Sequence, residues 1–83
     1  MPDYHSILDD LYRILQPYVK KEHKITEDAE LVSELGLDSV KIMDLLLHIE
    51  DHYDISIPLN ILPDINTVKD LATTLDKLLN SSQ

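Results

Sequence analysis

The only glycine of this 83-residue chain, Gly36, lies three residues before a serine that begins an apolar-rich helical segment. The stretch reads Leu35-Gly36-Leu37-Asp38-Ser39-Val40. Glycine tolerates positive φ, so Gly36 is the position where the chain is expected to turn sharply into Asp38 and Ser39. We therefore predict that the rest of the chain is a scaffold that exposes Ser39 to solvent.

The size and composition of the chain restrict how it can be stabilised. Eighty-three residues favour one domain, and we expect a single domain over 1–83. The chain has no cysteine, so disulfides and thiolate metal sites cannot contribute. Hydrophobic residues make up 43% of the sequence and must supply a sufficient core by themselves.

Apolar residues recur at spacings of three and four in three segments, which indicates amphipathic helices. Pro17 lacks a backbone donor, so the first helix is expected to kink or end close to Gln16. The residues after Pro58 have room for one short helical turn. The predicted helices span about 3–17, 39–53, 59–63 and 67–79. The predicted fold class is all-α: a small four-helix bundle with a long first loop and a short third helix.

The charge of the chain is strongly negative and unevenly distributed. The net charge is −9, and the segment 25–57 contains nine acidic residues and one base, Lys41. Nucleic acid and anionic membranes are therefore poor partners, whereas basic protein surfaces are favourable ones. The sequence shows no signal peptide and no apolar run of about 20 residues for membrane insertion, so we expect a cytoplasmic protein.

The predicted helix 39–53 has two different faces. Its core stripe consists of Ile42, Leu45, Leu46, Ile49 and Tyr53. On the outward face two apolar residues are framed by charged ones, which is typical of a small docking surface. The residues predicted to bind partners are Val40, Lys41, Asp44, Leu47 and Asp51.

Catalysis by Ser39 alone is not expected. A serine nucleophile needs a histidine within hydrogen-bond reach. His48 and His52 follow on the same helix at about 13 and 20 Å from Ser39, given a rise of 1.5 Å per residue. The Gly-x-Ser-x-Gly elbow of serine hydrolases is absent from the sequence.

A resident metal ion is not expected either. His48 and His52 stand four residues apart, as a zinc-binding pair does, but the sequence offers no third ligand beside them. The acidic residues also lack the spacing of a calcium-binding EF-hand loop. We interpret the two histidines as a solvated pair.

A helix N-terminus does suit a phosphodiester. It presents amide hydrogens without helical partners and the positive end of the helix dipole. A simple capping role for Ser39 is the alternative interpretation of its position. Asp38 is placed to cap the helix or to help hold a metal ion that a modifying enzyme supplies.

The stretch around Ser39 resembles the Asp-Ser-Leu attachment motif of acyl carrier proteins. The similarity extends in family-like spacing through Ile25-Thr26, Ala29, Leu31, Leu45, Leu46, Ile49, Glu50, Tyr53-Asp54, Ile57-Pro58 and Thr67-Val68. The resemblance implies that Ser39 receives a 4′-phosphopantetheine arm from coenzyme A through a Mg-dependent phosphopantetheinyl transferase, with Asp38 as a helper. The thiol of that arm holds an acyl group as a thioester, which explains thioester chemistry in a chain without cysteine.

The same resemblance implies a carrier that enzymes modify and use, rather than an enzyme. Its expected partners are the transferase and the acyl-loading and acyl-transfer enzymes of fatty-acid, polyketide or related pathways, with basic docking surfaces. We expect a monomer. Two alternatives stay open: a carrier of aminoacyl or peptidyl groups, and an unmodified acidic helical adaptor protein.

Several residues depart from the family pattern. Lys41 stands where family members often have an acid, and Val40 replaces the usual leucine. His48 and His52 replace small or acidic residues. These changes leave the attachment motif intact and alter the surface that a partner meets, so we expect a specialised carrier.

Overall fold

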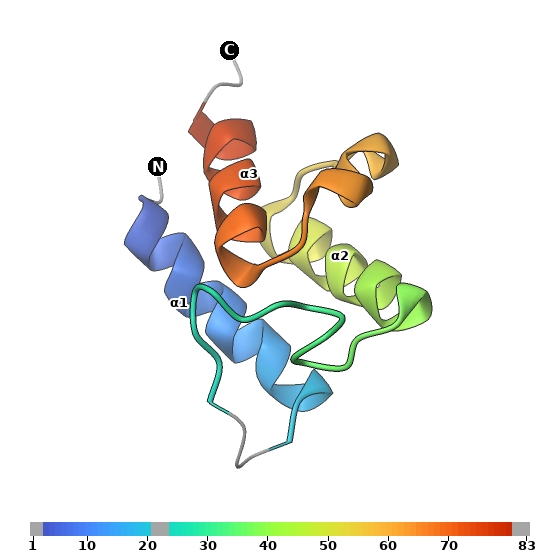
Figure 1. Cartoon of the computed structure of the whole chain (residues 1–83). Helices are drawn as coiled ribbons and strands as arrows, with labels where there is room; N and C mark the ends of the chain where they lie inside the picture. Colours follow the sequence, from blue (N-terminus) through green and yellow to red (C-terminus); the bar gives the residue numbers. More distant parts are fainter. Residues whose placement is uncertain (1–2, 21–23, 81–83) are drawn as a thin grey trace.

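The computed structural model describes residues 3–20 and 24–80, which form three α-helices and two 3-10 helices (Figure 1). In chain order these are α1 (Tyr4–Leu15), η1 (Gln16–Tyr18), α2 (Ser39–Tyr53), η2 (Leu59–Asp64) and α3 (Val68–Asn80). The described residues contain no strand, and Glu30 and Thr67 form one isolated antiparallel bridge. The predicted all-helical class is confirmed.

Two of the predicted helices differ from the observed ones in type or extent. The first, expected over 3–17, is α-helical only over Tyr4–Leu15. Pro17 lies in the 3-10 turn η1 that follows, where its missing N–H costs no α-helical bond. The short third helix, expected over 59–63, is the 3-10 helix η2, and it contains Pro63. This segment is too short and too restricted by proline to form a regular α-helix.

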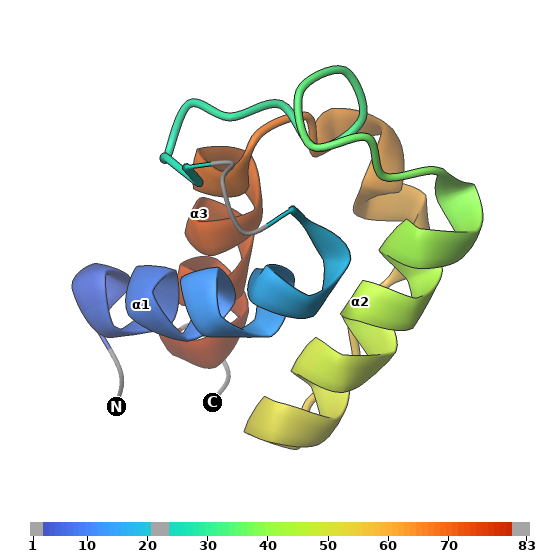
Figure 2. The same cartoon turned by 90° about the horizontal axis from the view of Figure 1, so that it is seen from below.

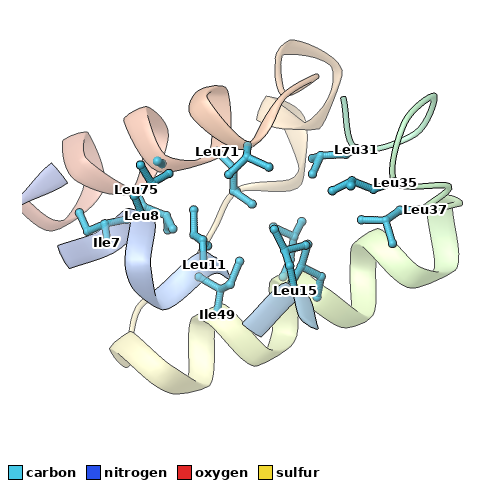
Figure 3. Close-up of a cluster of buried hydrophobic side chains, with 14 of the residues drawn as sticks. Ile7, Leu8, Leu11, Leu15, Leu31, Leu35, Leu37, Ile49, Leu71 and Leu75 are labelled. Atoms are coloured by element: carbon cyan, nitrogen blue, oxygen red, sulfur yellow. The ribbon is translucent and has the colours of Figure 1, made fainter. Parts of the chain in front are cut away.

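The core lies where α1, α2 and α3 meet the loop between η1 and α2 (Figure 3). Among the described residues every buried side chain is apolar, so no fully buried side chain needs a hydrogen-bond partner. The fully buried large side chains are mostly leucine and isoleucine and come from all of these segments. They include Ile7, Leu11, Leu15, Leu31, Leu37, Leu45, Ile49, Leu71 and Leu75.

The described part of the loop, residues 24–38, is bound to the bundle and crosses one end of it (Figure 2). The N–H of Leu31 donates to the carbonyl of Asn66 at 2.9 Å, and the N–H of Val68 donates to the carbonyl of Ala29 at 3.1 Å. Leu35 and Leu37 of this loop bury their side chains in the core. These contacts anchor the chain before it enters α2.

Two tyrosine–aspartate hydrogen bonds join the first part of the chain to α2. The hydroxyl of Tyr18 donates to Asp44 at 2.6 Å, and that of Tyr53 donates to Asp10 at 2.7 Å. His52 Nε2 lies 3.4 Å from the same oxygen of Asp10. Desolvation and the Asp44 carboxylate raise the pKa of Tyr18 to about 12, and burial with Asp10 raises the pKa of Tyr53 further. Both hydroxyls therefore stay protonated donors at neutral pH.

Candidate functional site at the start of α2

Gly36 makes the turn that leads into α2. Its φ is +71°, a conformation that L side chains rarely adopt, while a Cβ placed there would meet no atom within 4 Å. The backbone conformation, rather than lack of space, therefore requires glycine here. The turn is closed by bonds from Gly36 N–H to Val32 O at 3.1 Å and from Leu37 N–H to Leu31 O at 3.0 Å.

Asp38 is the N-cap of α2, and Ser39 is the first helical residue. Asp38 has extended backbone geometry, and its carboxylate accepts the N–H of Lys41 at 2.9 Å. Ser39 is exposed. Within the described part of the chain, the amide hydrogens of Ser39 and Val40 have no protein acceptor. The serine hydroxyl thus stands beside free amide donors at the positive end of the helix dipole.

An apolar cavity of about 340 Å³ lies directly beside Ser39. It is lined by residues of α2, η2, the loop around Leu31 and the start of α3, and it is open to solvent on one side. Side chains that face it include Ile42, Leu46, Leu62, Ile65 and Leu71. Sequence analysis could not size this space, because it depends on how far η2 stands from α2.

The exposed face of α2 contains the residues predicted to bind partners. Val40 is 76% exposed and Leu47 is 62% exposed, and Lys41, Asp44 and Asp51 are also exposed. Their accessibility agrees with the prediction, while their role in binding stays a prediction. Sequence analysis missed two further exposed apolar side chains, which are Met43 on α2 and Val32 on the loop.

Asp44 has a second role that the sequence did not reveal. Besides lying on the exposed face, it accepts the hydroxyl of Tyr18 and lies 3.7 Å from Nε2 of His48. A substitution of Asp44 therefore alters the contact between η1 and α2 as well as the surface charge. Asp51 has the same charge on the same face of α2 and makes no such contact among the described residues.

The described residues include no group of three or more histidine, aspartate or glutamate side chains arranged to hold a metal ion. His48 and His52 each lie near a different carboxylate, those of Asp44 and Asp10. In the part of the chain that the structure describes, no helix is long and apolar enough to cross a bilayer.

The start of α2 thus presents an exposed serine beside an apolar cavity in a small helical fold. Comparison with known proteins identifies the kind of domain. The family model described as "Phosphopantetheine attachment site" matches residues 9–75. The chain therefore belongs to the phosphopantetheine-attachment family, and its role is that of an acyl carrier.

Named relatives agree with this assignment. An acyl carrier protein from Thermotoga maritima is 33% identical over 58 residues, which cover 70% of this chain and 72% of that protein. One from Bdellovibrio bacteriovorus is 33% identical over 54 residues, covering 65% and 69%. A solved structure of a Mycobacterium tuberculosis protein assigned as an acyl carrier protein superposes with a TM-score of 0.76 at 30% identity, covering 83% of this chain and 93% of that one. Family membership implies a covalently attached phosphopantetheine and interaction with the enzymes that attach it and use it.

Proposed function

We propose that Ser39 is the attachment point of the phosphopantetheine arm and that this chain carries acyl groups as thioesters on it. The observation that carries the proposal is the position of Ser39, which is exposed in the first turn of α2 and borders the apolar cavity. The amide hydrogens of Ser39 and Val40, which have no acceptor among residues 3–20 and 24–80, suit the phosphodiester that joins the arm to the protein.

The attachment is a phosphoryl-type transfer to the serine. The hydroxyl oxygen of Ser39 forms a bond to the phosphorus that bears pantetheine, and the pyrophosphate P–O bond of coenzyme A breaks. Adenosine 3′,5′-bisphosphate leaves, and a base of the transferase takes the serine proton. A Mg ion brought by the transferase would offset the phosphate charge, and Asp38, which precedes Ser39 and caps α2, would help hold that ion.

The cavity beside Ser39 is suited to the apolar part of the cargo. The arm supplies the thiol that forms the thioester, and the chain supplies an apolar space next to the attachment point. Of the apolar residues that face this space, Ile42 and Leu46 come from α2 and Leu62 comes from η2. Burial of an acyl chain against these side chains stabilises it by about 0.8 kcal/mol per CH₂ group.

The exposed face of α2 is the proposed docking surface for the transferase and for acyl-loading and acyl-transfer enzymes. Val40 and Leu47 supply apolar contact, and Asp44 and Asp51 attract basic partner surfaces. In this proposal the chain is a substrate and partner of enzymes and has no catalytic residue of its own. The fatty-acid or polyketide context, the monomeric state and the cytoplasmic location stay predictions from the sequence.

The proposal is tested by incubation with coenzyme A, Mg and a broad-specificity phosphopantetheinyl transferase, followed by intact mass measurement. We expect a mass gain of one phosphopantetheine for the wild type and none for Ser39→Ala. Ser56→Ala is the matched control, because Ser56 is another exposed serine, outside the helices. Circular dichroism of Ser39→Ala should match the wild type.

Two results would count against attachment at Ser39. One is a wild-type chain that gains no mass under conditions that modify a known carrier, which would favour an unmodified adaptor. The other is a mass gain that persists in Ser39→Ala. If the arm attaches as expected, the thioester found on protein from its native cell distinguishes acyl from aminoacyl cargo.

A further inference from the structure

Lys41 occupies a position that weakens α2. It lies in the first helical turn, where the positive end of the helix dipole disfavours a cation, and that turn contains no acidic residue. The first turn of α3, in contrast, contains Asp70. Residues that break a local stability rule in a folded protein are often found at functional sites. Lys41 is two residues from the proposed attachment serine.

Lys41 shares a hollow with a second lysine from a different part of the chain. Lys20, which follows η1, lines the same space of about 440 Å³ as Lys41, and Tyr18 and Gly36 also line it. Neither lysine forms an ion pair within the described residues, although the chain has 16 acidic residues and seven basic ones. Two lysines without an ion-pair partner among the described residues therefore border one concave surface.

The acidic residue at the edge of this hollow keeps its negative charge but forms no ion pair with either lysine in the described part of the chain. Glu34 also lines the hollow, but its Oε1 accepts the backbone N–H of Glu30 at 3.2 Å. The Tyr18 hydroxyl is likewise engaged, because it donates to Asp44. The hollow is thus bordered by two lysines and one carboxylate, and the lysines are the groups in its lining that can bind an anionic ligand.

The hollow is separate from the cavity proposed for the cargo. Ser39 borders the apolar cavity, which is lined by η2 and α3, whereas Lys41 borders the hollow next to η1. The start of α2 therefore has an apolar side and a basic side. Along α2, Lys41 lies nearer to Ser39 in the chain than Asp44 and Asp51 do, so an enzyme docked on the exposed face contacts Lys41 close to the attachment serine.

We propose that Lys41, together with Lys20, is a partner-selectivity element that accepts a carboxylate side chain of the docking enzyme. The inference rests on the proposed carrier function. A carboxylate at this place is favoured by both lysines and by the positive end of α2, whereas a basic side chain is repelled by them. The acidic residues further along α2 attract basic groups. A matching partner therefore presents a carboxylate opposite Lys41 and basic side chains opposite Asp44 and Asp51. Such a pattern rejects enzymes with uniformly basic docking surfaces.

The first experiment measures kcat/KM for modification by a phosphopantetheinyl transferase chosen for a basic docking surface. We expect Lys41→Glu to raise kcat/KM about threefold to tenfold at low salt, and Lys41→Gln to raise it less. Lys69→Glu is the matched control, because Lys69 is also an exposed lysine in a first helical turn, that of α3. It should change kcat/KM less than about twofold. The differences should shrink in about 0.5 M NaCl, where charges are screened within a few Å.

The second experiment tests the carboxylate itself. Lysine and arginine residues on the docking surface of the same transferase are changed singly to glutamate, and each variant is measured with wild-type carrier and Lys41→Glu. We expect at least one transferase variant to modify the wild-type carrier faster than the unchanged transferase does. The same transferase variant should modify the Lys41→Glu carrier more slowly than the unchanged transferase does. The thermal midpoint of Lys41→Gln should not fall below that of the wild type, which separates docking from folding.

The outcomes separate this inference from the proposed function. Equal effects of Lys41→Glu and Lys69→Glu mean that only total charge matters, and they overturn the selectivity role of Lys41. An unchanged or lower kcat/KM for Lys41→Glu, or the absence of any such reversal among the enzyme variants, overturns it as well. If neither the wild type nor any variant is modified, attachment at Ser39 fails and the inference falls with it.

Discussion

The starts of α2 and α3 are capped in opposite ways. At α3, Thr67 Oγ1 accepts the N–H of Asp70 at 3.1 Å, and Asp70 Oδ2 accepts the N–H groups of Thr67 at 3.1 Å and Asn66 at 3.0 Å. This is a reciprocal capping box with aspartate at its third helical position. At α2, Asp38 accepts one amide hydrogen. The third helical residue is Lys41, whose side chain cannot accept the backbone N–H of Asp38 in return.

The remaining amide donors reinforce this difference. The N–H of Val68 donates to Ala29 O at 3.1 Å and that of Lys69 to Glu27 O at 2.8 Å, so the loop closes over the start of α3. The corresponding amides of α2, those of Ser39 and Val40, face solvent without protein acceptors in the described part of the chain. A buried helix start must satisfy its donors internally, whereas an exposed one can leave them to water or to a ligand. The start of α3 is closed by protein hydrogen bonds, whereas the start of α2 leaves two amide donors without a protein acceptor among the described residues.

The largest expected loss in the free energy of unfolding is on the buried face of α3, and the exposed face of α2 provides the comparison. Leu75 is fully buried on α3, and Leu75→Ala should lower the free energy of unfolding by about 2–5 kcal/mol through lost burial and a cavity. Leu47→Ala on α2 should change it by less than about 0.5 kcal/mol. Urea denaturation followed by circular dichroism measures both. If Leu75→Ala does not fold, Leu75→Val should still show a loss of about 1 kcal/mol. A similar cost at Leu47 would show that the α2 face is part of the core.

A smaller effect is expected at the capping box of α3. Asp70→Ala should cost about 1–2 kcal/mol near neutral pH, because two amides lose their acceptor. Exposed Asp64, which has no hydrogen bond among the described residues, is the matched control and should cost less than about 0.5 kcal/mol.

The contribution of Asp70 should depend on pH. The backbone N–H groups of Asn66 and Thr67 lower the pKa of Asp70 below its ordinary value of 3.8. A carboxyl whose folded pKa is lowered stabilises the fold above its unfolded pKa, and the contribution disappears as pH falls through the folded pKa. The stability gap between wild type and Asp70→Ala should therefore be constant above about pH 5 and close at lower pH. If the stability difference between wild type and Asp70→Ala persists at low pH, the difference comes from packing rather than from the ionised cap.

The smallest change in stability is expected at Asp38, where two roles can be separated. Asparagine is as good an N-cap as aspartate, so Asp38→Asn should change the free energy of unfolding by less than about 0.5 kcal/mol. If the carboxylate also helps hold the transferase Mg ion, the same variant should lower kcat/KM for modification by about tenfold. Asp38→Ser, which keeps a capping oxygen, is the control for side-chain shape. An unchanged kcat/KM for both variants would limit Asp38 to capping.

The predictable features of this protein are those that depend on residues close together in the chain. The spacing of apolar residues predicted the helical segments and the core stripe of α2, because that periodicity follows from helix geometry alone. Gly36 predicted the turn for the same local reason, and its positive φ confirms that prediction. The extent of η2 was less predictable, because Pro63 and the packing around it decide between helix types.

Tertiary structure alone decided which distant residues meet. Tyr53 and Asp10 are 43 residues apart, and Tyr18 and Asp44 are 26 apart, so no periodicity predicts their hydrogen bonds. The cavity beside Ser39 and the hollow shared by Lys20 and Lys41 likewise depend on how separate segments are placed. The sequence by itself determined that this chain is a helical carrier with a serine at the start of a helix. The packing of η1, η2 and the loop around that helix start decided what lies on each side of the serine, because cavities and charge clusters form between segments and not within them.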